Sequence, residues 1–370
     1  MVATSATPSA AETLATFKGR RVLVTGHTGF KGAWLVTWLE RLGAQVAGLS
    51  LAPDAGGLFD RCGVAPRLQH HVGDIRDLAV VRGVVDAFQP ELVFHLAAQA
   101  LVRRSFADPL ETVTTNVVGT AHVLEAVRLR GAPCAVVVVT SDKCYEPAVG
   151  AHAHVETEPM GGHDPYSMSK GAAELLVASW RHSFFAAEGK VLLATGRAGN
   201  CIGGGDVSAD RLVVDAVRAF AAGRAVELRN PGHVRPWQHV LDPLHGYLVL
   251  GAALLARGPR AASLCEAFNF GPRQEDAATV RQVIELLIER WGAGRWEDVS
   301  ARKNPPENPL LMLDTGKARA RLGWRPLLPL GDAVAWTVEW YRAAADGADH
   351  RQLLELTQAQ IGRFMERVTA

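Results

Sequence analysis

The sequence predicts an α/β fold, a Rossmann-type doubly wound parallel sheet joined to a smaller, mostly C-terminal α/β substrate domain. Strand and helix patterns alternate from residue 20 to about residue 200. A glycine-rich turn joins the first strand to the first helix, and the alternation stops after Arg197, near a run of three glycines that begins at Gly203. We therefore assign residues 1–17 to a flexible tail, 18–200 to the Rossmann domain and 201–370 mainly to the second domain, with later segments able to rejoin the sheet.

The individual elements follow from apolar patterns and chain breakers. Short apolar runs rich in β-branched residues predict buried parallel strands at residues 22–25, 45–51, 92–96, 135–140 and 191–197. Apolar residues at helical spacing predict helices at residues 33–42, 77–88, 112–130 and 165–187. The first helix stops at Gly43, a residue type that commonly ends helices.

Composition limits the classes of function. The 370 residues carry a formal net charge of +1 and no basic run, which argues against nucleic-acid and membrane surfaces. No segment approaches the ~20 apolar residues of a membrane helix, and the start of the chain lacks the pattern of a signal peptide. The five cysteines are scattered without a C-x-x-C pair, so we expect reduced thiols, no zinc site and a cytoplasmic protein.

Gly26, Gly29 and Gly32 are spaced G-x-x-G-x-x-G between the first predicted strand and helix. The first glycine permits the tight turn, and the others let backbone approach a pyrophosphate and let the helix pack on the strand. Free N–H groups at the helix start, together with its dipole, favour an anion there. The loop therefore predicts a dinucleotide site.

Other parts of the cofactor site carry weaker signals. The second strand ends with Ser50 and has no acid to hold the adenosine ribose, so NAD and NADP are not distinguished there. Asp74 follows the third strand and would either contact adenine or cap a turn. We expect the cofactor to contact Gly26, His27, Thr28, Gly29, Phe30, Lys31, Gly32, Asp74, Ile75, Leu96, Ala97, Ala98, Gln99, Thr115, Tyr166 and Lys170.

Tyr166 and Lys170 lie four residues apart at the start of a predicted helix, so their side chains share one face. We expect the ammonium of Lys170 to lower the pKa of the Tyr166 phenol. A phenolate near neutral pH is a general base that takes a hydroxyl proton as hydride leaves the same carbon. Together with the glycine loop, the pair resembles the extended short-chain dehydrogenase/reductase superfamily.

Thr140, Ser141, Asp142 and Lys143 follow the most hydrophobic predicted strand. Ligands bind outside the carboxyl ends of the strands in an open α/β sheet, so these side chains would face the nicotinamide. The alternative is ordinary capping and turn chemistry. The nearby Tyr166 favours a catalytic role for Ser141, Asp142 and Lys143.

Longer strings resemble the CDP-glucose 4,6-dehydratase family of nucleotide-sugar dehydratases over about residues 18–345. They are VTGHTGFKG at 24–32, TSDKCY at 140–145, PMGG and DPYS within 159–167, RAGN and IGGGD within 197–206, and RPWQHV at 235–240. His27 stands where other sugar dehydratases have a small residue, and Lys143 stands where they have glutamate. The resemblance implies NAD as the cofactor and a nucleotide-diphosphate sugar, CDP-glucose, as the substrate.

The same resemblance implies residue roles. Tyr166 and Lys170 serve oxidation at C4, Ser141 hydrogen-bonds the C4 oxygen, and Asp142 protonates the departing C6 hydroxyl. Lys143 replaces the glutamate that removes the C5 proton, either as the base itself or as a group that orients the substrate. Hydride passes from C4 to NAD+ and returns to C6, which gives a 4-keto-6-deoxy sugar and water. His27 is expected to weaken NAD binding.

The substrate diphosphate requires cations from the second domain. Arg211 and Arg235 are the candidates because arginine binds phosphate in bidentate geometry, and Asn200 is expected at the sugar or the phosphate. The family tends to carry aromatic residues between Tyr145 and Pro159, whereas this chain has histidines there. We interpret these histidines as part of a solvated loop without a metal.

Two other functions stay open. A nucleotide-sugar 4-epimerase or reductase would share the loop, Tyr166 and Lys170, but has no need of Asp142 and Lys143. A non-catalytic NAD-binding regulator would tolerate loss of Tyr166 or Lys170. Relatives often dimerise through two long helices, so we expect a homodimer or higher homo-oligomer.

Overall fold

The computed structural model describes residues 10–147, 152–186, 188–302 and 311–369. Its main sheet has seven strands in the order β11-β6-β5-β4-β1-β2-β3, and every neighbouring pair runs parallel. The strands are β1 (Arg21–Thr25), β2 (Gln45–Ser50), β3 (Gln69–Val72), β4 (Leu92–His95), β5 (Cys134–Val139), β6 (Val191–Ala198) and β11 (Ala267–Phe270). Strands β1 to β6 have the strand order of a Rossmann fold, which confirms the predicted fold class.

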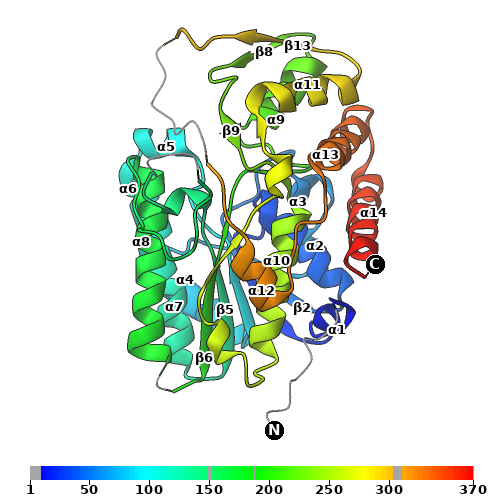
Figure 1. Cartoon of the computed structure of the whole chain (residues 1–370). Helices are drawn as coiled ribbons and strands as arrows, with labels where there is room; N and C mark the ends of the chain where they lie inside the picture. Colours follow the sequence, from blue (N-terminus) through cyan, green and yellow to red (C-terminus); the bar gives the residue numbers. More distant parts are fainter. Residues whose placement is uncertain (1–9, 148–151, 187, 303–310, 370) are drawn as a thin grey trace.

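Helices cover both faces of this sheet (Figure 1). Successive strand residues point to opposite faces, so Val22 and Val24 lie in one core and Leu23 lies in the other. One face is covered by α4 (Leu78–Phe88), α7 (Gly119–Arg130) and α8 (Pro165–Trp180). The other face is covered by α2 (Phe30–Arg41) and α10 (Leu241–Leu255), the second of which is buried on nearly all sides.

The two long predicted helices exist, but each contains a π turn that the periodicity did not indicate. α6 (Pro109–Val113) runs through a π turn at Thr114–Val118 into α7. α8 likewise continues into a π turn at Arg181–Phe185. One extra residue in a turn barely changes an apolar pattern, although it rotates the side chains that follow it.

A second unit stands above the carboxyl edge of the sheet. It contains α9 (Leu212–Ala221), β8 (Ala225–Leu228), α11 (Val280–Trp291), β13 (Arg295–Asp298) and α13 (Leu330–Ala345), which enclose a separate core. In Figure 1 this unit lies on the same side as α5 (Val102–Ala107), the helix that follows β4. The loops that follow β4, β5 and β6 therefore face it.

Later segments do return to the Rossmann unit. β11 completes the sheet, and α12 (Gly316–Leu322) and α14 (His350–Thr369) contribute side chains to the core on the α2 side. The substrate role assigned to residues 201–370 thus concerns only part of that range.

The predicted tail is wrong for residues 10–17. They form α1 (Ala10–Ala15) and a turn, and the side chains of Leu14 and Phe17 are buried. Phe17 lies 6.4 Å from the ring of Phe94 in β4, so two apolar side chains anchor this segment to the core. Residues 1–9 lie outside the described part of the chain.

All five cysteines are free in the structure. Among the described helices, none combines the length and the hydropathy that crossing a membrane requires.

Candidate active site

The glycine loop joins β1 to α2, and its three glycines meet different constraints. Gly26 has a φ of +75°, and a Cβ there would lie 2.6 Å from the backbone N of Ala97. A Cβ on Gly32 would overlap the carbonyl oxygen of Gly26. Gly29 has space for a side chain, since a Cβ there would lie 3.5 Å from its nearest neighbour, the carbonyl oxygen of Gly26. Gly29 begins α2 without a side-chain cap, so the helix N–H groups fit an anion such as a dinucleotide pyrophosphate.

The side chain of His27 is buried on the β2 and β3 side of the loop. Its Nε2 lies 2.6 Å from Nδ1 of His70, and its ring meets Phe59 edge-on at 5.2 Å. The ring fills the space above Gly48, where a Cβ would approach it within 2.3 Å. Burial lowers the pKa of His27 to about 4, so the imidazole is neutral near pH 7. In Rossmann domains the adenosine half of the dinucleotide lies on this side.

Two polar residues at the ends of β2 and β3 already have partners. Ser50 shares a 2.7 Å hydrogen bond with Thr28 of the glycine loop. Asp74 accepts hydrogen bonds from the guanidinium of Arg76 at 2.9 and 2.6 Å, and this contact holds the pKa of Asp74 below its usual range. The structure therefore has Asp74 in a local turn, and its contact with adenine stays a prediction.

Residues 96–98 follow β4 and lie, partly exposed, next to the glycine loop. The backbone of Gln99 is held by Asn116, which accepts from its N–H at 2.8 Å and donates to its C=O at 2.9 Å. Asn116 also donates to Oγ of Ser169 on α8 at 2.9 Å. Asn116 stands beside Thr115 in the π turn. The turn thus positions Asn116 between Gln99, which follows β4, and Ser169 on α8. Sequence reasoning missed this residue because helical periodicity does not reveal a π turn.

Tyr166 and Lys170 occupy the first turns of α8, which Asp164 caps by accepting from the N–H of Ser167 at 2.9 Å. Both side chains are buried. Burial lowers the pKa of Lys170 to about 8, and the positive charge of Lys31 acts in the same direction. The buried amine is therefore partly neutral near pH 8.

The expected effect of Lys170 on the pKa of Tyr166 stays a prediction, because other influences dominate that pKa in the structure. Burial raises the pKa of Tyr166, and a hydrogen bond with Ser141 and the charges of Arg211 and Lys31 only partly oppose this. Lys31 itself stands in the first turn of α2, and its ammonium lies beside Cys201 and Tyr247. The cationic surroundings of the phenol therefore come from residues that the spacing of Tyr166 and Lys170 does not indicate.

Residues 140–145 after β5, which are predicted to carry catalytic groups and are called the catalytic loop below, form a tight turn. Ser141 accepts from the N–H of Lys143 at 3.3 Å and donates to Oδ1 of Asp142 at 2.9 Å, while Nζ of Lys143 lies 3.7 Å from the same oxygen. Oδ2 of Asp142 is buried and has no hydrogen-bond partner within the described chain. It points toward Gly199, where a Cβ would lie 2.9 Å away. A buried, unpartnered carboxylate oxygen is costly unless a ligand satisfies it.

Behind this loop lies a buried ion pair that sequence reasoning missed. The carboxylate of Glu174 accepts from Thr140 at 2.5 Å, from Thr195 at 2.9 Å and from the guanidinium of Arg197 at 2.8 Å. Arg197 also donates to the hydroxyl of Tyr145 at 2.8 Å. These bonds tie α8 to β6 and to both ends of the catalytic loop. The available signal was the position of Glu174, one turn after Lys170 on the same helix face.

The three expected substrate residues are placed differently. Arg211 precedes α9, donates to the carbonyl of Ala100 at 3.4 Å and lies close enough to Tyr166 to lower its pKa. Asn200 lies two residues after β6 and follows Gly199, the residue that approaches Asp142. Arg235 is buried in β9 (Val234–Arg235), where its guanidinium contacts Nδ1 of His233 at 3.2 Å.

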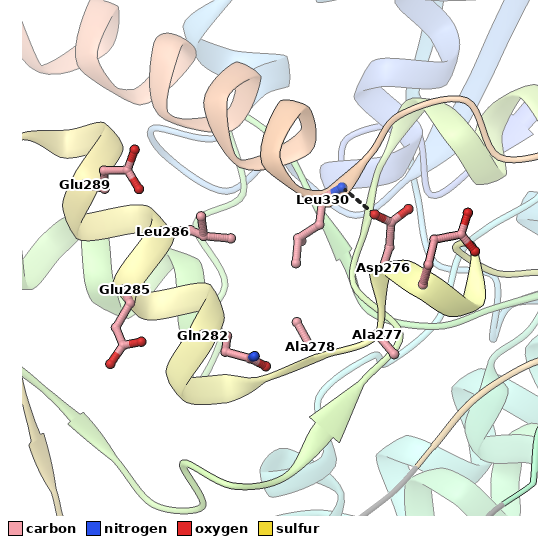
Figure 2. Close-up of a pocket in the computed structure, with 9 residues that line it drawn as sticks. Asp276, Ala277, Ala278, Gln282, Glu285, Leu286, Glu289 and Leu330 are labelled. Atoms are coloured by element: carbon pink, nitrogen blue, oxygen red, sulfur yellow. Dashed lines mark hydrogen bonds between the residues drawn. The ribbon is translucent and has the colours of Figure 1, made fainter.

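A pocket of about 440 Å³ lies elsewhere, between α11 and the start of α13 (Figure 2). Asp276 at its edge accepts from the N–H of Leu330 at 3.2 Å. Its lining carries four carboxylates, which would repel a diphosphate, so we do not assign the substrate to it. The lining residues are Glu275, Asp276, Ala277, Ala278, Gln282, Glu285, Leu286, Glu289 and Leu330.

The parallel sheet, the glycine loop at its carboxyl edge and the Tyr166/Lys170 pair on α8 together define a member of the extended short-chain dehydrogenase/reductases. More narrowly, the chain belongs to the GDP-mannose 4,6-dehydratase family, whose model matches residues 23–336.

Relatives within this class include both dehydratases and epimerases. The chain is 44% identical to the CDP-glucose 4,6-dehydratase of Salmonella typhimurium over 358 residues, which cover 95% of this chain and 98% of the relative. The dTDP-glucose 4,6-dehydratase of Streptomyces venezuelae, solved with NAD bound, superposes with a TM-score of 0.75 at 27% identity and covers 87% of this chain and 97% of its own. The UDP-glucose 4-epimerase of Thermus thermophilus, in complex with NAD, also has a TM-score of 0.75 at 27% identity and covers 88% and 99%.

Proposed function

We propose that this protein is an NAD-dependent hydro-lyase that converts CDP-glucose to CDP-4-keto-6-deoxyglucose and water. The observation that carries the proposal is the catalytic loop, where Ser141, Asp142 and Lys143 lie beside Tyr166 with one carboxylate oxygen left unpartnered. The 44% identity to a CDP-glucose 4,6-dehydratase supports the substrate.

The first half of the reaction is an oxidation at C4 of the sugar. Tyr166 takes the proton of the C4 hydroxyl, and Ser141, which is hydrogen-bonded to Tyr166, turns its O–H from Asp142 to donate to the C4 oxygen. Bound NAD+ would supply the hydride acceptor and later return the hydride to C6. Because the pKa of Tyr166 is raised in the protein alone, the cations around it are needed for its role as a base.

The second half is the loss of water across C5 and C6. Lys143 accepts the C5 proton, and Asp142 donates a proton to the departing C6 hydroxyl through the oxygen that has no partner in the chain. The two side chains are 3.7 Å apart. A proton moved from Lys143 to Asp142 would leave a neutral amine and a carboxylic acid, which are the two states that the elimination requires.

A panel of CDP-, dTDP-, GDP- and UDP-glucose tests the proposal, with the product read by mass spectrometry. We expect the loss of one water from CDP-glucose at a kcat/KM well above that of the other three sugars. Loss of water from another sugar nucleotide alone would refute the substrate. A change of sugar configuration without loss of water would instead favour a 4-epimerase, the activity of the structural relative from Thermus thermophilus.

We further propose that the protein self-associates through α7 and α8. Val118 and Leu129, 11 residues apart, share one face along the α7 segment, and Met168 and Leu175, seven apart, share one face of α8. All four are exposed, and Leu175 is 61% exposed. A patch of large apolar side chains on two neighbouring helices is typical of an interface.

The free cysteines support a reducing compartment, the cytoplasm, as the place of this reaction.

A 4-keto-6-deoxy sugar nucleotide is suited to deoxysugar biosynthesis, including that of lipopolysaccharide O-antigens.

A further inference from the structure

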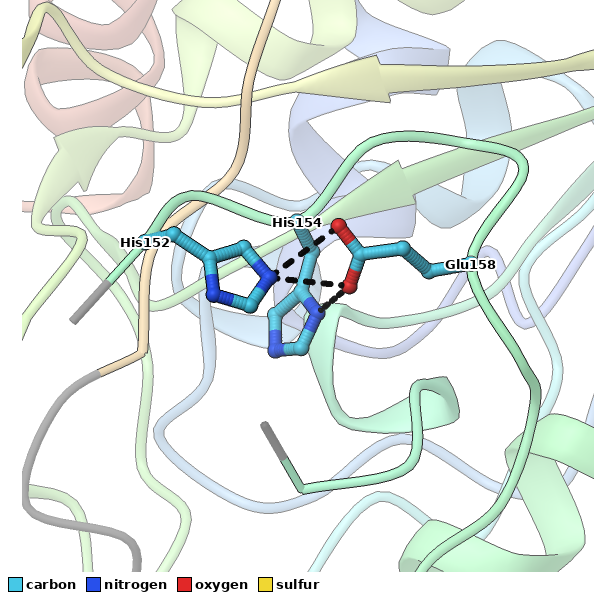
Figure 3. Close-up of side chains that lie close together, drawn as sticks. All are labelled: His152, His154 and Glu158. Carbon is cyan, nitrogen blue, oxygen red and sulfur yellow. Dashed lines mark hydrogen bonds and ion pairs between the residues drawn. The ribbon is translucent and has the colours of Figure 1, made fainter. Parts of the chain in front are cut away.

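The segment after the catalytic loop brings together three side chains that could hold a metal ion. Figure 3 shows His152, His154 and Glu158 directed toward one another. One donor atom from each lies within 4.8 Å of the other two. Nδ1 of His154 is 2.6 Å from the carboxylate of Glu158, and Nε2 of His152 is 3.2 and 3.3 Å from its two oxygens.

The spacing explains why the donors converge. His152 and His154 are two apart, and residues i and i+2 on extended backbone point to the same side. The chain then turns, with the N–H of Glu158 donating to the carbonyl of Val155 at 3.1 Å. This turn returns the carboxylate of Glu158 to the face that carries both imidazoles.

His154 is held rigidly from several sides. Its N–H donates to Met312, and its carbonyl accepts from the N–H of Asp314, each at 2.9 Å. Its ring stacks on Tyr145 with centroids 4.7 Å apart and an angle of 2° between the planes. Only 3% of the side chain is exposed, compared with 49% for His152.

Glu158 is also prepared for a cation. Its carboxylate lies within hydrogen-bond distance of both imidazoles and of the backbone N–H of Val155. One oxygen accepts from that N–H at 3.0 Å, which orients the carboxylate. Two of the three donors are thus fixed, and the third sits on an exposed side chain that is free to adjust.

We propose that His152, His154 and Glu158 form a zinc-class transition-metal site. Two imidazole nitrogens and one carboxylate oxygen are a known ligand set for Zn²⁺, with water in the remaining position. Metal–ligand bonds of about 2.0–2.2 Å require the His154–Glu158 pair to open from its hydrogen-bonded distance to roughly 3.3 Å. The ion would replace the shared proton of that pair.

The site would act on the catalytic loop without touching the substrate. His154 stacks on Tyr145, which follows Lys143 by two residues and bonds to Arg197. A metal on His154 would therefore restrain the end of the loop that carries the proposed acid and base.

The test is a titration of the full chain, stripped with EDTA, with Zn²⁺ by calorimetry and with Co²⁺ by visible absorption. We expect one bound equivalent and the absorption bands of a tetrahedral site. His152→Ala removes an exposed side chain and should weaken binding by at least about tenfold, as should Glu158→Gln. Zn²⁺ should raise the Tm of the unaltered protein and leave that of His152→Ala nearly unchanged.

His182→Ala is the matched control, because His182 is an exposed histidine outside the cluster. It should bind as tightly as the unaltered protein. The proposal is overturned if no stoichiometric binding is seen, or if His152→Ala and Glu158→Gln bind as well as the control does. In that case the cluster is a hydrogen-bonded His–Glu group without a metal. Neither readout depends on catalysis.

Discussion

At the scale of single residues, the surroundings of Asp142 define the proposed acid. The side chain is 1% exposed, one oxygen is shared by Ser141 and Lys143, and the other oxygen has no partner in the described chain. A group placed only for a turn would have both oxygens satisfied or exposed. The environment thus favours the catalytic over the capping interpretation of this loop.

Lys143→Ala should stop the elimination while C4 oxidation survives. General base catalysis typically contributes ~10²–10⁴-fold, so product formation should fall by about that factor. In a single turnover with CDP-glucose, NADH absorbance should rise and persist because the later steps are blocked. Lys190→Ala, which removes an exposed lysine paired with Glu188, serves as the control. Undiminished product formation would show that Lys143 is not the base.

His27→Gly should tighten NAD+ binding and destabilise the fold. The substitution removes bulk from the dinucleotide loop, but it also empties the space between Gly48, Phe59 and His70. A buried ring of this size contributes about 2–4 kcal/mol to the free energy of unfolding. Titration with NAD+ gives the dissociation constant, and urea unfolding gives the stability. An unchanged dissociation constant would refute the role of His27.

At the scale of elements, the Glu174–Arg197 pair joins α8, β5 and β6. The hydrogen bonds from Thr140 and Thr195 satisfy the remaining lone pairs of the carboxylate. The helix that carries Tyr166 is therefore fixed to the strand that precedes residues 140–145. Buried charges are tolerated only when paired and hydrogen-bonded in this way.

Glu174→Gln should lower the free energy of unfolding by about 3–5 kcal/mol, because it leaves the guanidinium of Arg197 buried without a counter-charge. Urea unfolding at neutral pH measures this change. Glu188→Gln, at an exposed position, should change stability by at most about 0.5 kcal/mol. A loss for Glu174→Gln no larger than that of the control would contradict the role of the pair.

His245 on α10, unlike the Glu174–Arg197 pair, is a buried polar group that destabilises the fold. Its ring is buried against Trp38 and Phe364, and neither ring nitrogen has a hydrogen-bond partner within the described chain. His245→Phe keeps the ring contacts and removes two unsatisfied groups, so it should stabilise the protein by about 1–3 kcal/mol. Urea unfolding at pH 7 would show this, and a destabilised variant would mean that an unseen partner satisfies the imidazole.

At the scale of the whole molecule, buried histidines make the fold sensitive to acid. Burial lowers the pKa of His27 and His245 to about 4 and that of His95 and His239 to about 3. Between those values and the unfolded value of about 6.5, the unfolded chain binds more protons, so stability falls as the pH falls. Asp242, whose pKa burial raises to about 7, acts in the opposite direction.

We therefore expect the free energy of unfolding to decrease as the pH falls from about 6.5 to 4, by about 1.4 kcal/mol per pH unit for each titrating histidine, and Tm to decrease with it. Differential scanning calorimetry across this range measures the slope. In His245→Phe, stability should depend less steeply on pH, because one of those four buried histidines no longer contributes. A Tm that stays constant or rises on acidification would contradict the excess of buried neutral imidazoles.

Leu175→Lys should disrupt the proposed association. It places a charge in the exposed apolar patch of α8, and the monomer should fold normally because the side chain is 61% exposed. Light scattering after size exclusion would report a smaller mass than for the unaltered chain. Arg351→Ala on α14 removes an exposed side chain away from this patch and should leave the mass unchanged. Equal masses for Leu175→Lys and the unaltered chain would place any interface elsewhere.

Local patterns in the sequence determined the Rossmann fold, the glycine loop and the Tyr166/Lys170 pair. Each depends on residues within one turn or one strand–helix unit, where chain geometry alone sets which side chains meet. The net pKa shift of Tyr166 could not be predicted from spacing, because burial, which periodicity does not measure, is its largest cause. The tail prediction failed because Leu14 and Phe17 find a core that distant strands provide.

Only the tertiary structure brought Asn116 to Gln99, Glu174 to Arg197, and His154 to both Tyr145 and the segment at residues 312–314. These partners are far apart in the chain, and no short-range spacing indicates that they meet. Their contacts depend on which strands lie side by side and on how the loops cross the carboxyl edge. The sequence by itself thus determined the chemistry available to this protein, and the packing decided which groups are buried, paired or left open to a ligand.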